Sequence, residues 1–337
     1  MTNLKPRREF LYITGVFLFF LLFAISILAG TKGLRFSDGL AALTGLFSGK
    51  EIPAGVKIIL LKIRLPRALA AAFCGAALSV SGLILQTSLN NTLASPGIMG
   101  INSGAGLFAL LASLVFPYSV AFRTAFAFTG AILAVLIVYL ISTKAGVSRT
   151  TLILAGVAVS SLMSAGVDII ITLHPEIIAD KVAFSLGGFQ NLNLRQLYFA
   201  LPVIVVAVAV LLLLSGGIDL FALGDEAAFG LGLNIKLYRL LAILISAVLA
   251  GCAVSLCGLL GFVGLIIPNF IRMMGKNKTR VNISLCVIFG SDFLMFCDLI
   301  SRLLFYPYEL PVGLFLSCLG CPFFIWMLIS KKKHLSV

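Results

Sequence analysis

Two aspartates lie inside an apolar stretch of the chain, where a charged carboxylate is costly. Asp292 and Asp298 both fall within residues 283–300. Asp298 precedes Arg302 by four residues, so an i,i+4 ion pair on one helical face accounts for it. Asp292 stands alone. It could carry a coupling proton, as ionisable groups at membrane depth often do, or it could hydrogen-bond to the backbone or to Ser291.

Residues suited to catalysis or metal binding are sparse. The sequence has two histidines, His174 and His334, and no cluster of hard or soft metal ligands. The pattern Gly-x-x-x-x-Gly-Lys-Ser/Thr does not occur, so the chain has no such cradle for nucleotide phosphates. Cys318 and Cys321 have redox-motif spacing, but all seven cysteines fall in apolar segments, where cysteine packs as a small hydrophobe. We therefore expect a chain that is not an enzyme and binds no metal or cofactor itself.

The composition predicts an integral membrane protein. Hydrophobic residues make up 61% of the 337 residues, charged residues make up 11%, and the mean hydropathy is +1.15. An ordinary soluble domain is about 25% charged. The formal net charge of +13 does not indicate a nucleic-acid-binding protein, because the basic residues are spread over short connections instead of gathering on one face.

Apolar segments recur along the whole chain, and a membrane span needs roughly 20 such residues. They occupy residues 11–29, 68–85, 98–116, 121–141, 152–173, 197–214, 240–256, 259–271, 283–300 and 312–329. The segments near residues 117 and 267 are short or interrupted by Gly and Pro, which is typical of broken helices beside a transport pathway. We expect one all-α membrane domain over residues 1–337 with about ten transmembrane helices.

The ends of the chain indicate its orientation. Lys5, Arg7 and Arg8 precede a first apolar segment that is longer than the apolar region of a signal peptide. With an uncleaved first span, ten spans and a basic run at residues 331–333, both termini are expected in the cytoplasm of a prokaryote. The connection over about residues 31–62 is then external, and that over about residues 215–239 is cytoplasmic.

One run of the chain is apolar and yet rich in Gly, Ser, Asn and Pro. It covers residues 64–106 and is predicted to form a wall of a transport pathway, because polar breaks at membrane depth are tolerated only within protein or beside a cavity. Part of it, Gly75-Ala-Ala-Leu-Ser-Val-Ser-Gly82, parallels Gly251-Cys-Ala-Val-Ser-Leu-Cys-Gly258. The expected topology runs the first copy inward and the second outward, as in an inverted repeat.

A series of short motifs along the chain resembles a known transport family. The motifs are Arg64-Leu-Pro-Arg67, Gly75-Ala-Ala-Leu78, Ser81-Gly82, Gln86, Asn91-x-Leu-Ala94, Pro96, Gly100, Ser103-Gly-Ala105, Leu154-Ala-Gly156, Gly224-Asp-Glu-Ala-Ala228, Gly258 to Pro268, Arg272, Asp298 to Arg302, Glu309 to Gly313 and Gly320 to Phe323. In this order they resemble the membrane permeases of ABC importers for iron-siderophores, haem and cobalamin.

The resemblance implies a type II ABC importer permease that sits in lipid and pairs with a second copy or a similar subunit. It implies two cytoplasmic ATPases, which hold the ATP and magnesium, and an extracytoplasmic substrate-binding protein. Import of an iron chelate such as a siderophore is favoured, with haem or cobalamin as alternatives. An ion-coupled secondary transporter and a non-transporting membrane scaffold are the competing classes.

A polar stretch in the cytoplasmic connection matches the coupling helix of this family. Its residues are Asp225, Glu226, Ala227, Ala228 and Gly232. Acidic residues suit the start of a short helix, and glycine suits its end. The resemblance implies that this helix docks on the ATPase, and a solvated loop helix is the alternative.

Three arginines border the expected outer ends of spans. The resemblance implies that Arg64, Arg67 and Arg302 form an external basic ring that receives glutamates of the binding protein. Alternatively, they merely anchor helix ends, with Arg302 partly occupied by Asp298.

The remaining candidates are polar or helix-breaking residues near the pathway or its gate: Gln86, Asn90, Asn91, Pro96, Ser103, Thr150, Pro268 and Asn269. Two positions depart from the family pattern. Thr92 stands where the family has proline in Asn-Pro-Leu-Ala, and Asn269 stands where it has histidine in Pro-His. Both lie near expected inner ends of spans, so the gate could differ in shape from that of relatives.

Overall fold

The computed structural model describes residues 5–29, 53–145, 149–190, 192–221, 230–231, 234–275, 278–304 and 308–334, and every regular element in these ranges is helical. The long helices are α1 (Lys5–Leu28), α4 (Leu65–Ser88), α5 (Ile101–Val115), α6 (Val120–Lys144), α7 (Arg149–Leu173), α9 (Leu194–Phe221), α11 (Ile235–Cys257), α12 (Val263–Met274), α13 (Thr279–Leu303) and α14 (Val312–His334). The short elements are α3 (Ala54–Ile58), η1 (Ile59–Arg64), η2 (Pro96–Met99), η3 (Pro175–Ile177) and α8 (Ile178–Leu186).

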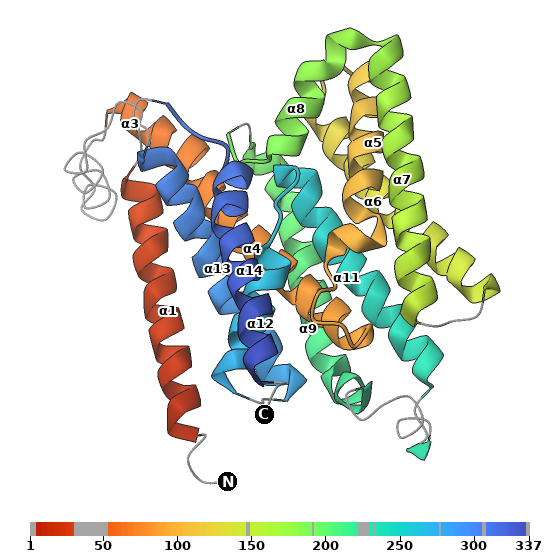
Figure 1. The fold of residues 1–337 in the computed structure, drawn as a ribbon. Helices are drawn as coiled ribbons and strands as arrows, with labels where there is room; N and C mark the ends of the chain where they lie inside the picture. The colour runs from red at the N-terminus through yellow and green to blue at the C-terminus, as the bar shows by residue number, and fades with distance from the viewer. Residues whose placement is uncertain are drawn as a thin grey trace.

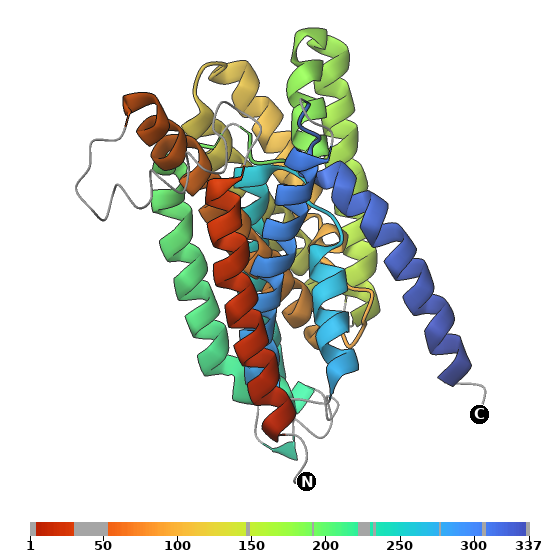
Figure 2. The same ribbon diagram turned by 90° about the vertical axis from the view of Figure 1, so that its left-hand side faces the viewer.

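The long helices form one bundle (Figures 1 and 2). In the described part of the chain, seven helices are long and apolar enough to cross a membrane, and α5, α12 and α14 contribute shorter apolar stretches. These helices coincide with the ten apolar segments of the sequence. α1 begins and α14 ends at the same end of the bundle, which we call the terminal end, and the opposite end is called the far end.

Helix α4 is the most buried of the candidate spans. Of its most apolar stretch 89% is buried, against 22% for α1 and for α7. A Cβ atom on Gly75 would collide with the backbone of Gly290 in α13, and one on Gly82 would collide with the backbone of Gly264 in α12. Because small residues let membrane helices approach closely, the Ala, Gly and Ser content of α4 explains how it sits between its neighbours.

The two similar eight-residue segments lie on α4 and α11, which pack together and run in opposite directions (Figure 1). Ser81 Oγ donates to the carbonyl of Ser246 at 2.8 Å, and Cys74 Sγ lies 4.0 Å from the carbonyl oxygen of Ala253. A later residue of α4 therefore contacts an earlier residue of α11. This antiparallel pairing agrees with the expected inverted repeat.

Irregular backbone interrupts the bundle at several points. The π-helical turn η1 joins α3 to α4, so residues 54–62 of the expected external connection are helical. η2 ends at Gly100, whose φ of 77° lies in the left-handed region that glycine adopts readily. α12 follows Phe262, which has a φ of 67°, and contains Pro268. The short helices expected near residues 117 and 267 from the Gly and Pro pattern are α5, with 15 residues, and α12, with 12 residues.

Candidate functional site

Four charged residues meet at the far end of the bundle and form what we call the ion cluster. Arg67 on α4 places Nε 3.0 Å from Asp298 Oδ1 and Nη1 2.8 Å from Glu309 Oε2. Arg302 lies 3.0 Å from Asp298 Oδ2, one turn along α13, as the sequence predicted. Two arginines and two carboxylates balance, which is the condition under which buried charges are tolerated.

The three arginines expected at the outer surface are in fact buried, with exposed fractions of 4% for Arg64, 7% for Arg67 and 3% for Arg302. Arg64 donates to the carbonyls of Ile27 and Leu28 at 3.0 and 2.6 Å, which are among the last carbonyls of α1. In this chain they do not form an exposed basic ring. Their role in docking a binding protein stays a prediction, and so does the alternative in which they anchor helix ends.

A second polar group lies where α4 ends, and we call it the polar junction. Arg272 Nη1 donates to Gln86 Oε1 at 2.6 Å, and Gln86 Nε2 donates to the carbonyl of Gly264 at 3.1 Å. Asn269 Nδ2 donates to the carbonyl of Thr92 at 3.2 Å. The two departures from the family pattern, Thr92 and Asn269, therefore contact each other and tie the segment after α4 to α12.

Among the other gate candidates, the amide of Asn91 donates to the carbonyl of Gln86 at 3.0 Å, which places the turn after α4 at this junction. Asn91 Oδ1 accepts from the amide of Leu93 within the same turn, and Asn90 has a positive φ of 46°. Pro96 starts η2, Pro268 is buried within α12, and Thr150 lies exposed near the start of α7. The expected coupling residues 225–228 and 232 lie outside the described residues.

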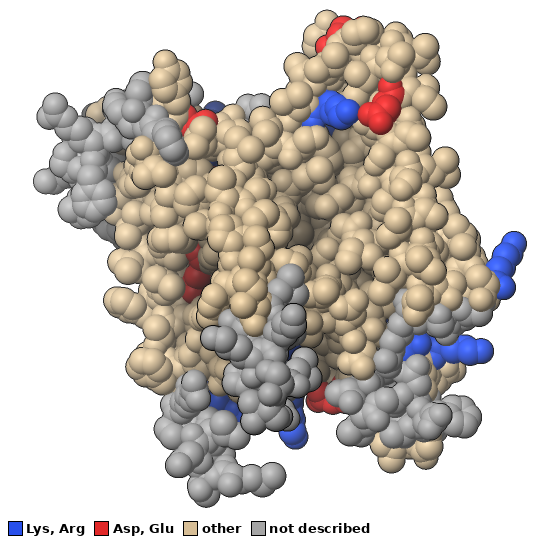
Figure 3. All heavy atoms as spheres, in the orientation of Figure 1, with Lys and Arg blue, Asp and Glu red and all other residues tan. Residues whose placement is uncertain are grey.

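One face of α7 is polar although the helix is long enough to span a membrane. Ser161, Ser164, Asp168 and Thr172 recur at three- or four-residue spacing, so they share a face, and all four are exposed in the single chain. We call this face the polar stripe. Figure 3 shows that most charged side chains on the face in view lie toward the two ends of the bundle.

The polar stripe continues into a cavity of about 220 Å³ beside α8, the smaller cavity. Its polar lining consists of Asn102, Ser103, Ser164, Asp168, Lys181 and Ser185. Lys181 Nζ lies 3.2 Å from Asp168 Oδ1 and so links α8 to α7. Of the gate candidates, Ser103 is the one that lines this cavity.

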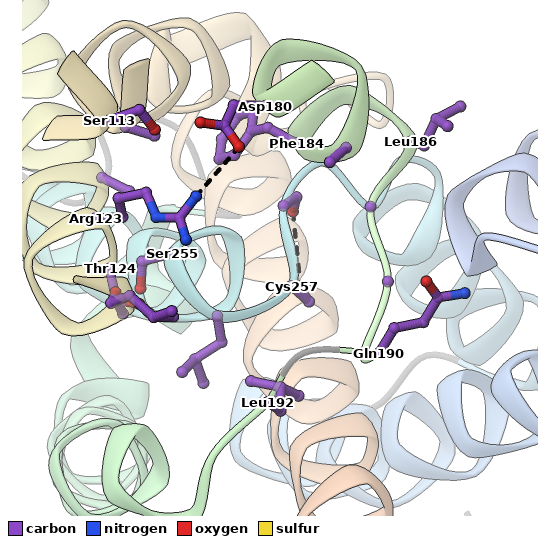
Figure 4. Close-up of a pocket in the computed structure, with 18 of the residues that line it drawn as sticks. Ser113, Arg123, Thr124, Asp180, Phe184, Leu186, Gln190, Leu192, Ser255 and Cys257 are labelled. Atoms are coloured by element: carbon purple, nitrogen blue, oxygen red, sulfur yellow. Dashed lines mark hydrogen bonds and ion pairs between the residues drawn. The ribbon is translucent and has the colours of Figure 1, made fainter. Parts of the chain in front are cut away.

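A larger cavity of about 680 Å³ lies on the other side of α8, between the far ends of α5, α6, α9 and α11 (Figure 4). Arg123 Nη1 and Asp180 Oδ1 lie 3.2 Å apart in its lining. Leu110 and Phe184 line both cavities, so α5 and α8 separate them. Neither Arg123 nor Asp180 was singled out as a site residue from the sequence.

The model of the FecCD transport family matches residues 18–330 of the chain. The chain belongs to the FecCD transport family. It is 32% identical to the Fe(3+)-citrate import system permease protein YfmD of Bacillus subtilis, over 98% of this chain and 97% of that protein. It is also 32% identical to the vitamin B12 import system permease protein BtuC of Klebsiella pneumoniae, over 98% of this chain and 97% of that protein.

A solved structure agrees with the family assignment. It is described as an inward-facing conformation of a metal-chelate type ABC transporter and has a TM-score of 0.84 at 27% identity, covering 96% of this chain and 99% of that chain. The family and the all-helical membrane fold expected from the sequence are confirmed. As a FecCD member, the chain is a multi-pass transport permease.

Proposed function

We propose that this permease forms the membrane pathway of an ABC importer that carries a ferric chelate across the cytoplasmic membrane. The observation that carries the proposal is the polar stripe on α7. Hydroxyl and carboxylate groups facing hydrocarbon are unfavourable, so such a face must contact water or protein. A second copy of the chain, or a similar subunit, would cover the stripe and enclose a water-filled route.

The chemistry of the route supports a hydrophilic cargo. The smaller cavity offers hydroxyl and amide groups and one ion pair, Asp168 with Lys181. Such groups interact with a chelate rich in carboxylate or hydroxyl oxygen without competing for the metal inside it. The similarity to an iron-citrate permease favours a ferric chelate, and haem or cobalamin is the alternative cargo.

The assembly that we propose has the terminal end in the cytoplasm. Two ATPases, which bind the ATP and magnesium, would dock there on the segment containing Asp225, Glu226, Ala227, Ala228 and Gly232. An extracytoplasmic binding protein would deliver cargo at the far end. Since Arg64, Arg67 and Arg302 are buried, they would shape that docking surface through the helix ends that they hold.

Asp292 supports a second candidate, an ion-coupled secondary transporter. Its exposed fraction is 3%, and neither carboxylate oxygen has a hydrogen-bond partner among the described residues. The hydroxyl of Ser291 lies 2.8 Å from the carbonyl oxygens of both Ala72 and Val287, so it does not satisfy Asp292. Ionisable residues within membrane spans are functional-site candidates, and carrying a proton is one of their uses.

A bulky residue in the polar stripe tests the proposed pathway. Ser164→Trp should lower uptake of radioactive ferric citrate by roughly tenfold or more, about 1.4 kcal/mol in the transport barrier, because the indole fills the route. Leu213→Trp is the matched control, since Leu213 on α9 is 84% exposed on an apolar helix. Both variants should reach the membrane at wild-type levels. Equal uptake by the two variants would contradict a pathway along α7.

A further inference from the structure

The larger cavity leads to a cysteine at the end of α11. Cys257 is the last residue of α11 and lines the cavity with Ser255, Leu256 and Gly258 (Figure 4). The cavity reaches the surface, because Val120 and Val182 in its lining are 40% and 46% exposed. Cys257 itself is only 3% exposed. Cys257 thus borders a cavity that opens to the surface, while its low exposure shields it from a bulky reagent.

Cys257 has a second thiol beside it. Its Sγ lies 2.8 Å from the carbonyl oxygen of Ala253, and Cys74 Sγ on α4 lies 4.0 Å from the same oxygen. The two sulfurs therefore both lie within 4.0 Å of one oxygen atom. One carbonyl oxygen thus lies near the sulfurs of two residues that are 183 positions apart in the sequence (257 minus 74).

The register of the two helices explains why the sulfurs converge. Ser81 pairs with Ser246 and Cys74 pairs with Ala253, so Cys257 lies one turn nearer the far end than Cys74. Side chains on a helix lean toward its N-terminus. Because α4 and α11 are antiparallel, Cys74 leans toward the far end and Cys257 leans away from it. The two side chains approach each other between their own levels.

We propose that Cys74 and Cys257 form an oxidisable dithiol, which hydrogen peroxide reaches through the larger cavity and converts to a disulfide. The Cys257 thiolate attacks one peroxide oxygen, the O–O bond breaks, and the departing hydroxide takes the thiol proton to form water. The Cys74 sulfur then attacks the sulfenic sulfur of Cys257 while its proton passes to the departing hydroxide, so that the S–S bond forms and a second water leaves. Two thiols are oxidised and one peroxide is reduced to two waters.

The bridge would fix an element beside the proposed pathway. The amide of Gly188 donates to the carbonyl of Cys257 at 2.7 Å, and the amide of Leu259 donates to the carbonyl of Phe184 at 2.9 Å. The end of α11 is therefore attached to α8, the helix between the two cavities. A disulfide between Cys257 and Cys74 would hold the end of α11, and α8 with it, against α4. This consequence for transport rests on the proposed function, whereas the disulfide chemistry does not.

The chemical test uses the full-length chain in native membrane vesicles treated with hydrogen peroxide. After quenching, denaturation and alkylation of free thiols, wild type should lose two of its seven reactive cysteines, and peptide mass spectrometry should find Cys74 joined to Cys257. Dithiothreitol should restore both. Cys74→Ala should abolish the bridge and leave a Cys257 sulfenic acid that dimedone traps. In the native protein, a polyethylene-glycol maleimide should label neither residue.

Two variants serve as matched controls. Cys297→Ala lies in α13, outside both cavities, and Cys252→Ala lies in α11, five residues before Cys257. Both should still form the bridge. Cys318 and Cys321 are exposed and closely spaced, so the experiment is repeated with both changed to serine. A loss of thiols that disappears in that background, or the absence of a Cys74–Cys257 peptide in wild type, would overturn the proposal. Slower ferric citrate uptake after peroxide, reversed by dithiothreitol in wild type and absent in Cys74→Ala, would extend it to transport.

Discussion

Replacing Asp298 with leucine is expected to destabilise the folded chain by about 3–5 kcal/mol, because it leaves Arg67 and Arg302 buried without their shared counter-ion. Asp298 is fully buried and lies 3.0 Å from both guanidinium groups. Glu309 lies 2.8 Å from Arg67 and can still neutralise it. The free energy of unfolding in detergent, from thermal or denaturant titration, measures the loss.

Two further variants separate lost charge balance from lost packing. Glu309→Gln should cost less, because Glu309 is 17% exposed and Arg67 keeps Asp298. Combining Asp298→Leu with Arg67→Met and Arg302→Leu should recover much of the stability, since an apolar set of similar volume removes the stranded charges. If Asp298→Leu alone unfolded at the wild-type temperature, the ion cluster would not hold this end of the bundle.

Gly82→Ala is expected to destabilise the chain by about 1–3 kcal/mol through overpacking, although alanine is the better helix former. The new Cβ would meet the backbone of Gly264, which has no flexible side chain that could move away. α4 and α12 would have to separate, and the hydrogen bond from Gln86 to Gly264 would lengthen. Unfolding free energy and the yield of monodisperse protein from membranes measure the effect.

The matched control for Gly82 is Gly216→Ala in α9, where an added Cβ meets nothing within 4 Å. There the intrinsic preference for alanine should act alone and stabilise the chain by about 0.5–1 kcal/mol. The two substitutions therefore have opposite expected signs. A stabilising Gly82→Ala would refute the close approach of α4 and α12.

The membrane helices could be predicted from the sequence because each is a local run of apolar residues. The pair Asp298 and Arg302 was equally accessible, since the partners are one helical turn apart. The burial of Arg67 was not predictable in this way. Its partners Asp298 and Glu309 lie 231 and 242 residues away, and they meet it only after α4, α13 and the segment before α14 have packed.

The site shows the same division between local and distant signals. Gly, Ser and Asn in residues 64–106 indicated a pathway wall, and Ser103 does line a polar cavity. The polar stripe on α7 was missed, although Asp168 within an apolar segment was a usable signal of the same kind as Asp292. Contacts between distant segments, such as Gln86 with Arg272 and Thr92 with Asn269, needed the fold.

Transport by the reconstituted protein tests the central claim most directly. The chain, its ATPase and its binding protein would be placed in proteoliposomes, and uptake of radioactive ferric citrate, haem and cobalamin would be measured with and without ATP and with a proton ionophore. We expect ferric citrate uptake that requires ATP, survives the ionophore and persists in Asp292→Asn. Uptake that continues without ATP, follows the proton gradient and disappears in Asp292→Asn would contradict the account.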